Sequence, residues 1–364
     1  MTTHDGASGA KGDRREVAGR NYSLMEYFNR LAEERRPSLT FAGETKADWE
    51  RWRDGLSAKM LELYGEWPEG VPLNPDVVYR MDEGDFVREK VVLDTERHYS
   101  VPAYVLIPKD RRREKNGRLP AILCLHGHGQ FGKEAVAGVR DPNRPAIATS
   151  IVEHNYDYAA QMAREGYLTM TPDSRGFGEL GPDRDEMAGR DPCNVHFIRG
   201  LLLGLSLLTL NVWDMMKCID YLESRDEVDG DRIGAMGLSW GGTRTTFLSA
   251  LDERVKAADI ICYLAQFEHF AIREANFCGS QFLPHLYRYA DVADVAGLIA
   301  PRPLLVESGI YDTCFPVEPV LRAHEHLRRI YRGAEVEDRL HIDLFEGGHQ
   351  FHGPSAREFF ERYL

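Results

Sequence analysis

The sequence predicts an α/β protein whose mostly parallel central sheet carries helices on both faces. Three observations favour this fold class. Short apolar segments of strand length recur between residues 81 and 364, longer segments with helical periodicity separate them, and 364 residues are enough for one large α/β domain. Strands that alternate with helices are typical of a covered parallel sheet, because each crossover helix packs back onto a face of the sheet.

Composition and charge exclude several classes of protein. Hydrophobic residues make up 43% of the chain and charged residues 28%, as in ordinary globular proteins. The 45 Lys and Arg residues against 58 Asp and Glu residues leave a net charge of −13, which repels phosphate backbones and anionic bilayers. We therefore expect no nucleic-acid and no membrane partner. The first residues contain no apolar signal segment, so we expect a cytoplasmic protein.

The N-terminal part is predicted to differ from the rest. Residues 1–20 are rich in Gly, Ser and charges without periodicity, which predicts a flexible tail. Residues 21–80 are predicted as a helical extension. Apolar residues at helical spacing support it: Leu24, Tyr27, Phe28, Leu31, Trp49, Trp52, Leu56 and Met60. Such an extension either roofs an active site or forms an interface in a homo-oligomer, and the sequence leaves both open.

Eight segments within residues 81–364, the predicted catalytic domain, are expected to be strands. The first two, Phe86–Leu93 and Val101–Ile107, look like an antiparallel hairpin. The six others are short apolar runs typical of buried strands: Leu119–Leu125, Tyr167–Thr171, Arg232–Met236, Val255–Ile261, Pro303–Val306 and His341–Phe345. The uncharged run Leu201–Trp213 is shorter than the ~18 residues of a membrane span, and we expect a buried helix there.

The first chemical signal is the segment 237–241, Gly-Leu-Ser-Trp-Gly, which follows a predicted strand and precedes a helical segment. In such a sheet, ligands gather beyond the carboxyl ends of the strands. Glycines two residues before and two residues after a serine allow a sharp strand-to-helix turn, the nucleophile elbow, which exposes the hydroxyl above the sheet. Ser239 is therefore the predicted nucleophile.

Two further strand ends supply the acid and the base that a serine nucleophile needs. Asp312 follows the strand two places from the serine strand, and Glu307 is the competing acid. His349 lies in a glycine-rich loop after the last strand and is the predicted general base, with His352 in reserve. The imidazole removes the serine proton during attack, and the carboxylate stabilises the imidazolium that forms. The chain order Ser239, Asp312, His349 is a known order of such triads.

The turn 126–129, His-Gly-His-Gly, follows the strand Leu119–Leu125. A glycine-rich turn there can aim backbone N–H groups at the oxyanion of a tetrahedral intermediate. We expect the backbone N–H of His128, with that of Gly129 as the alternative, to donate to this oxyanion. The N–H of Trp240 is expected to donate from the opposite side. His126 is expected to hold the loop through hydrogen bonds.

No metal or organic cofactor is implied by the sequence. A metal site at His126 and His128 is not favoured, because no further ligand follows at suitable spacing. The six cysteines are scattered without a CxxC pair, so neither a disulfide framework nor a zinc site is indicated. We expect most of them to be reduced, buried thiols.

At this point the chain resembles the α/β-hydrolase fold and, within it, the acetyl xylan esterase and cephalosporin deacetylase group, which is related to the dienelactone hydrolases. The resemblance covers about residues 81–364 and rests on five segments: Leu123–Gly129, Thr171–Glu179, Glu227–Thr245, Ile299–Pro316 and Glu346–Phe351. It implies that Ser239, Asp312 and His349 are the triad. Asp173 and Arg175 match the D-x-R-G turn of the group, in which the Arg is usually structural, so neither belongs to the predicted catalytic set.

Two segments depart from the minimal fold, the N-terminal extension and a long loop from Gln130 to about Tyr158. Long loops of this kind often cover active sites or bind substrate. Gly129 and Tyr156 are the candidate substrate contacts. Further candidates without an assigned role are Asn155, Tyr158, Cys193, Asn194 and His196.

The sequence therefore predicts a serine hydrolase that cleaves a small-molecule carboxylic ester with a short acyl group through an acyl-enzyme. The resemblance adds acetylated carbohydrate as the substrate class. One alternative keeps the triad but acts on a carbon–carbon, lactone or peptide bond. Another alternative is a hydrolase-fold protein that binds a ligand without turnover.

Overall fold

The structure is a computed structural model that describes residues 20–129, 131–181, 191–274 and 277–364. Its centre is a mixed sheet in the order β1-β2-β3-β5-β4-β6-β7-β8-β9. The pairs β1–β2, β2–β3 and β3–β5 are antiparallel, and all other pairs are parallel. The strands are β1 (Asp76–Asp82), β2 (Phe86–Glu96), β3 (Tyr99–Pro108), β4 (Leu119–Leu125), β5 (Leu168–Pro172), β6 (Val228–Leu238), β7 (Val255–Ile261), β8 (Leu304–Gly309) and β9 (Leu340–Phe345).

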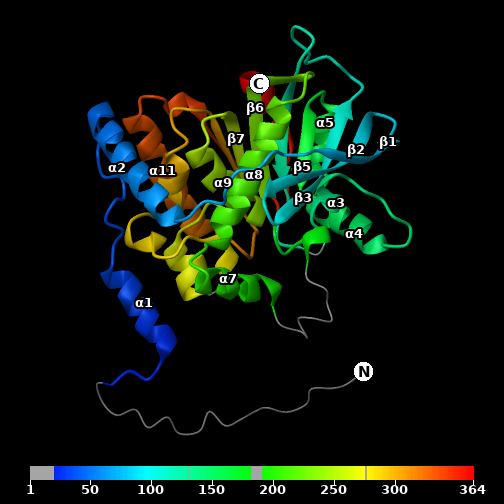
Figure 1. Ribbon diagram of the computed structural model, residues 1–364. Coiled ribbons are helices and arrows are strands. Elements are labelled where there is room, and N and C mark those ends of the chain that lie inside the picture. The colour runs from blue at the N-terminus through cyan, green and yellow to red at the C-terminus, as the bar shows by residue number, and fades with distance from the viewer. Residues whose placement is uncertain (1–19, 130, 182–190, 275–276) are drawn as a thin grey trace.

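Helices cover both faces of this sheet (Figure 1). One face packs against α2 (Lys46–Tyr64), α8 (Leu207–Glu223), α9 (Trp240–Leu251), α10 (Val292–Gly297) and α11 (Val317–Gly333). The other face packs against α3 (Lys133–Val136), α5 (Tyr158–Arg164) and α12 (Pro354–Tyr363). The remaining helices are α1 (Leu24–Glu34), α4 (Pro145–His154), α7 (Pro192–Leu202) and the short η1 (Gly178–Leu180), η2 (Glu268–Arg273), η3 (Gly279–Gln281), η4 (Leu286–Arg288) and η5 (Glu337–Arg339).

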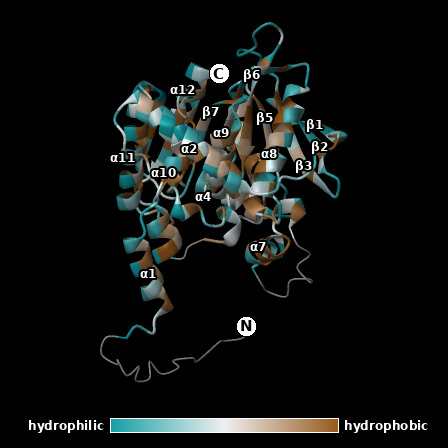
Figure 2. Ribbon diagram, turned by 60° about the vertical axis from the view of Figure 1, so that its left-hand side comes forward, coloured by the Kyte–Doolittle hydropathy of each residue, from teal (hydrophilic) through white to brown (hydrophobic). Residues whose placement is uncertain are grey.

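Burial explains why the central strands read as continuous apolar runs. Every residue of β4 is buried, because helices cover this strand from both sides. Figure 2 shows apolar colouring concentrated on the strands inside the molecule. The predicted fold class is confirmed. All eight predicted strands are present, and β8 lies two strands from β6 as expected.

Strand β1 was not predicted from the sequence. It is an edge strand, and all of its residues except Tyr79 are exposed. An exposed edge strand does not need the apolar alternation on which strand prediction depends. It lies at the end of the segment 21–80, which otherwise contains α1 and α2.

The prediction of one buried helix across Leu201–Trp213 was wrong. Helix α7 ends at Leu202, Gly204 adopts a φ of 79°, and the side chain of Ser206 caps the start of α8. Leu202 and Leu203 are 83% and 75% exposed. Among the described residues, no single helix is long and apolar enough to cross a bilayer, although α7 and α8, bent by 96°, reach that length together.

The two N-terminal helices pack at different places. Helix α2 begins with a capping box formed by Thr45 and Asp48 and packs against α11 through buried residues such as Trp49. Helix α1 extends from the body of the molecule and contacts η2 (Figure 1). The predicted flexible tail, apart from Arg20, lies outside the described residues.

Candidate active site

Ser239 lies on the turn between β6 and α9, with φ 60° and ψ −117°. A non-glycine residue at positive φ is strained, and this conformation is typical of a nucleophile elbow. The flanking glycines have no space for a side chain. A Cβ on Gly237 would lie 2.5 Å from the backbone of Gly241, and a Cβ on Gly241 would lie 1.9 Å from the Leu125 carbonyl oxygen. Gly237 is therefore needed for the elbow to turn sharply, and Gly241 is needed for the elbow to approach the end of β4.

His349 and Asp312 form a hydrogen-bonded pair on two neighbouring loops. His349 Nδ1 lies 2.7 Å from Asp312 Oδ2. The other carboxylate oxygen accepts the backbone N–H groups of Cys314 and Phe315 at 2.7 and 3.2 Å. The Phe315 ring also stacks on the imidazole, with 5.8 Å between ring centroids. The carboxylate is thus fixed by its own loop, and because Nδ1 faces it, Nε2 is the ring atom free to accept a proton.

A pocket of about 280 Å³ brings the serine and the histidine to one cavity. Its described lining comes from the turn after β4, from α3 and α4, from the elbow and from the His349 loop. The lining residues are Gly127, His128, Gly129, Phe131, Gly132, Ala135, Ser150, His154, Tyr156, Leu238, Ser239 and His349. In the described part of the chain, no hydrogen bond joins Ser239 Oγ to the His349 ring. Such contacts often tighten only when substrate binds.

The long loop predicted between Gln130 and Tyr158 contributes half of this lining, from Phe131 to Tyr156. Gln130 itself lies outside the described residues. No described residue of α1 or α2 lines the pocket, so these helices do not roof it. The insertion, not the N-terminal extension, therefore shapes the cavity beside Ser239.

The turn after β4 approaches the elbow closely on the side predicted for the oxyanion. The N–H of Gly127 donates to the Tyr156 hydroxyl at 2.5 Å, so this N–H is already engaged. The next two residues, His128 and Gly129, line the pocket together with Ser239. Trp240 begins α9 directly after the serine. Burial raises the pKa of Tyr156 to about 12, so its hydroxyl remains protonated while it braces this turn.

His126 holds the same turn from inside the protein. Its ring is fully buried, Nε2 accepts the Ser174 N–H at 3.0 Å, and Nδ1 lies 2.7 Å from the Gly127 carbonyl oxygen. Burial lowers the pKa of His126 well below its ordinary value. A neutral ring whose two nitrogens are both engaged by protein groups positions the loop and is not available for proton transfer to substrate.

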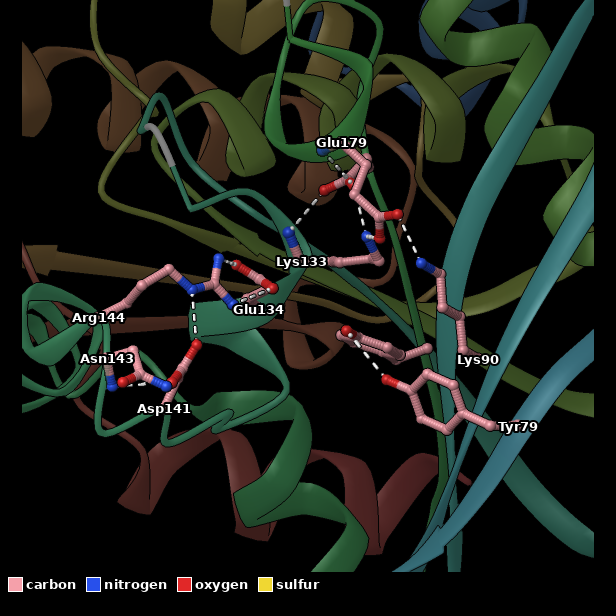
Figure 3. A network of polar contacts seen from close by, with 10 residues as sticks. Tyr79, Lys90, Lys133, Glu134, Asp141, Asn143, Arg144 and Glu179 are labelled. Carbon is pink, nitrogen blue, oxygen red and sulfur yellow. Dashed lines mark hydrogen bonds and ion pairs between the residues drawn. The ribbon is translucent and has the colours of Figure 1, made fainter.

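Charged residues anchor the start of the long loop to the sheet (Figure 3). Lys133 is fully buried; its Nζ lies 2.6 Å from Asp173 Oδ2 and also pairs with Glu179. Glu179 pairs in turn with Lys90 of β2 at 2.5 Å. A Cβ on Gly132 would lie 2.2 Å from Asp173 Oδ1. Because each of these charges has a partner, Asp173 acts as a structural anchor behind the pocket.

Arg175 is buried as well, and it is not among the described residues that line the pocket. Its guanidinium makes two hydrogen bonds with Asp214, at 2.7 and 2.8 Å, and an ion pair with Glu96 at 2.6 Å. Its contacts are those of a structural residue.

Asn155 and Tyr158, two further candidates of the long loop, do not line the pocket. Asn155 ends α4 and donates to the Phe351 carbonyl oxygen at 3.1 Å, on the loop that carries His349. Tyr158 is fully buried and donates to the Leu125 carbonyl oxygen at 2.5 Å. Both side chains thus hold segments that carry the site, the loop of His349 and the end of β4.

The competing acid and the reserve base lie together, outside the described lining of the pocket. His352 Nδ1 lies 2.6 Å from Asp343 Oδ2, and Glu307 Oε2 accepts the His352 N–H at 2.9 Å. Burial raises the pKa of Glu307 from its ordinary 4.5 to about 8, and the charge of Asp343 adds to the shift. Neither Glu307 nor His352 shares the cavity of Ser239.

One group of polar side chains was not found by sequence reasoning. His128 Nε2 lies 3.1 Å from Cys193 Sγ, and these atoms and Cys278 Sγ all lie within 4.8 Å of one another. The three residues come from the turn after β4, from α7 and from the segment before η3. Only tertiary packing brings them together, so no spacing in the sequence could indicate it.

Known proteins are similar to this chain in sequence or in fold. Residues 10–343 match the Abhydrolase family. A putative hydrolase, YtaP, of Bacillus subtilis is 27% identical over 299 residues, which cover 80% of this chain and 92% of that protein.

Two solved esterase structures show the fold. A putative acetyl xylan esterase from Bacteroides fragilis superposes with a TM-score of 0.72 at 20% identity, over 91% of this chain and 84% of that chain. A glucuronoyl esterase from Solibacter usitatus superposes with a TM-score of 0.65 at 16% identity, over 90% and 97%. The predicted resemblance to α/β-hydrolases of the acetyl xylan esterase group is confirmed at the level of fold.

Proposed function

The chain belongs to the Abhydrolase family, and from this premise we propose that it is a serine esterase that hydrolyses a small carboxylic ester through an acyl-enzyme. One observation carries the proposal. Ser239, on a strained elbow, and His349, paired with a buried carboxylate, line the same small cavity. That is the arrangement that acyl transfer by a serine requires.

Each group has a defined task in this mechanism. Ser239 Oγ attacks the ester carbonyl carbon while His349 Nε2 takes the hydroxyl proton, and Asp312 stabilises the imidazolium that results. The N–H groups of His128 and Trp240 stabilise the oxyanion of the tetrahedral intermediate. The alcohol leaves with the proton from His349, and the acyl group stays on Ser239. Water then repeats the sequence, with His349 as general base, and releases the acid.

The cavity favours a small, uncharged acyl group. Its volume of about 280 Å³ lies just below the usual range for ligand sites. No Lys or Arg occurs among its described lining residues, so the described lining offers no permanent cation to an anionic acyl group. An acetyl group is small and uncharged, so it agrees with both the volume and the lining of the cavity. The name of one structural neighbour, acetyl xylan esterase, supports an esterified carbohydrate as the alcohol part.

A substrate series on the purified full-length chain tests this proposal. We expect turnover of p-nitrophenyl acetate and of acetylated sugars, with activity falling as the acyl chain lengthens. Ser239→Ala should lower kcat by about 10⁴-fold or more at an unchanged melting temperature. Ser150→Ala is the matched control, because Ser150 lines the same pocket outside the triad, and it should stay within about 10-fold of wild type.

Other outcomes would replace the proposal. Retained turnover in Ser239→Ala would remove the serine mechanism. Turnover of lactones, peptides or carbon–carbon substrates with no ester turnover would show that the triad cleaves a different type of bond. Tight binding of acetylated sugars with neither turnover nor labelling by a fluorophosphonate would show a binding protein.

A further inference from the structure

A second cluster of reactive side chains lies beside the pocket, and the proposed triad does not use its thiols. It consists of His128, Cys193 and Cys278. His128 Nε2 lies 3.1 Å from Cys193 Sγ, and both atoms lie within 4.8 Å of Cys278 Sγ. We propose that these three side chains bind one Zn²⁺ ion.

The geometry fits a tetrahedral zinc site. Zinc binds thiolate sulfur at ~2.3 Å and imidazole nitrogen at ~2.0 Å, which places ligand atoms of a tetrahedron about 3.3–3.8 Å apart. The separations here, from 3.1 Å to at most 4.8 Å, bracket that range. Small side-chain rotations therefore suffice to reach it. Two sulfurs and one imidazole suit zinc and not calcium or magnesium, which take oxygen ligands.

The protein holds the two thiols together through contacts that do not involve sulfur. Asn194, next to Cys193, accepts the N–H of Gly279, next to Cys278, at 2.8 Å. A Cβ on Gly279 would lie 2.3 Å from the Phe197 ring, so α7 and η3 are in close contact. The site is thus pre-organised by packing, and zinc binding would not have to bring these segments together.

Burial differs between the sulfur side and the imidazole side of the cluster. Cys193 and Cys278 are 4% and 7% exposed, whereas His128 is exposed. An ion can therefore reach the cluster from the side of the imidazole. The hydroxyl of Ser280 lies 2.8 Å from Cys278 Sγ and supplies a further oxygen at the edge of the cluster. Three protein ligands leave one coordination position open.

The ion would act on the neighbouring turn and not on the ester itself. His128 also lines the pocket with Ser239, and zinc on its Nε2 would fix the turn that follows β4. Neither Ser239 nor His349 is a ligand. The zinc site therefore stands on its own geometry, and it would survive a failure of the proposed esterase function.

A spectroscopic titration of the reduced, full-length chain tests the proposal. Co²⁺ should bind with one equivalent and give the thiolate-to-cobalt absorption in the near ultraviolet together with the visible bands of a tetrahedral complex. One equivalent of Zn²⁺ should abolish both. Cys193→Ser and His128→Ala should each weaken Zn²⁺ binding, measured by calorimetry, by at least about 10-fold. His196→Ala, on the same helix as Cys193 and outside the cluster, should bind Zn²⁺ like wild type.

Three outcomes would overturn the proposal. The first is folded, reduced wild-type protein that shows no thiolate-to-cobalt absorption, and this result does not depend on any variant. The second is unchanged Zn²⁺ affinity in variants that keep the wild-type melting temperature. The third is a Cys193–Cys278 disulfide, mapped by non-reducing mass spectrometry, in a protein that binds no Zn²⁺ after reduction.

Discussion

Two histidine–carboxylate pairs lie close together near the end of the chain. His349 pairs with Asp312 at 2.7 Å, and His352 pairs with Asp343 at 2.6 Å. Each imidazole also stacks on a phenylalanine ring, with centroid distances of 5.8 and 4.8 Å respectively. The two pairs therefore have nearly the same hydrogen-bond length, and both imidazoles have an aromatic neighbour.

Their positions differ. Only His349 lines the cavity that contains Ser239. The side chain of Asp312 is 2% exposed and that of Asp343 is 16% exposed. A short hydrogen bond between imidazole and carboxylate therefore does not identify a catalytic pair. The position of the pair relative to the nucleophile does, and two pairs of matched substitutions test this difference.

The histidines give the largest expected contrast. His349→Ala removes the base that accepts the Ser239 proton, so kcat for p-nitrophenyl acetate should fall by about 10⁴- to 10⁶-fold. His352→Ala should leave kcat within about 10-fold of wild type, because this ring does not reach the cavity. Steady-state kinetics on both variants measures the contrast, with thermal melting as the control for folding. Equal losses in the two variants would show that the pairs do not have separate roles.

The carboxylates give the next contrast. Asp312→Asn keeps the shape of the side chain but removes the charge that stabilises the imidazolium, so kcat should fall by about 10³- to 10⁴-fold. Asp343→Asn makes the same chemical change in the other pair and should have little effect on kcat. An unaffected rate in Asp312→Asn would assign the acid to a different residue, and Glu307 would be the first to test.

Glu307 gives the smallest effect, which concerns stability. Its pKa of about 8, raised by burial, means that the folded chain binds more protons than the unfolded chain between about pH 4.5 and 8. Stability should therefore fall as pH rises through this window. Glu307→Gln keeps an acceptor for the His352 N–H but does not titrate, so its melting temperature should fall less over the same window. Asp259 is also buried, and its pKa is also raised. Part of the pH dependence of stability therefore remains in Glu307→Gln. Parallel melting curves for both proteins would contradict a protonated Glu307.

The elbow could be predicted from the sequence because its requirements are local. Gly237 and Gly241 are needed by contacts within a few residues of Ser239 and with the adjoining strand. The choice between His349 and His352 could not be made as firmly. Both lie in one loop, and only the fold shows which ring shares a cavity with the serine.

Other features were missed because they depend on long-range packing or lack an apolar pattern. The exposed edge strand β1 has no alternation of buried and exposed residues. The apolar run Leu201–Trp213 contains a bend at Gly204 that its apolar composition does not indicate. The contact between Cys193 and Cys278 arises where α7 meets η3, and neither segment alone indicates it. The expected cytoplasmic location, the lack of nucleic-acid and membrane partners, and a homo-oligomer through the N-terminal helices stay predictions.

The proposed function depends on Ser239 as the nucleophile and on His349 as the base that activates it. Peptide mapping after reaction with a fluorophosphonate tests this directly. We expect one phosphonyl group on Ser239 in wild type and in His352→Ala, and almost none in His349→Ala over the same time. A label on another residue, or equal labelling of His349→Ala and wild type, would contradict it.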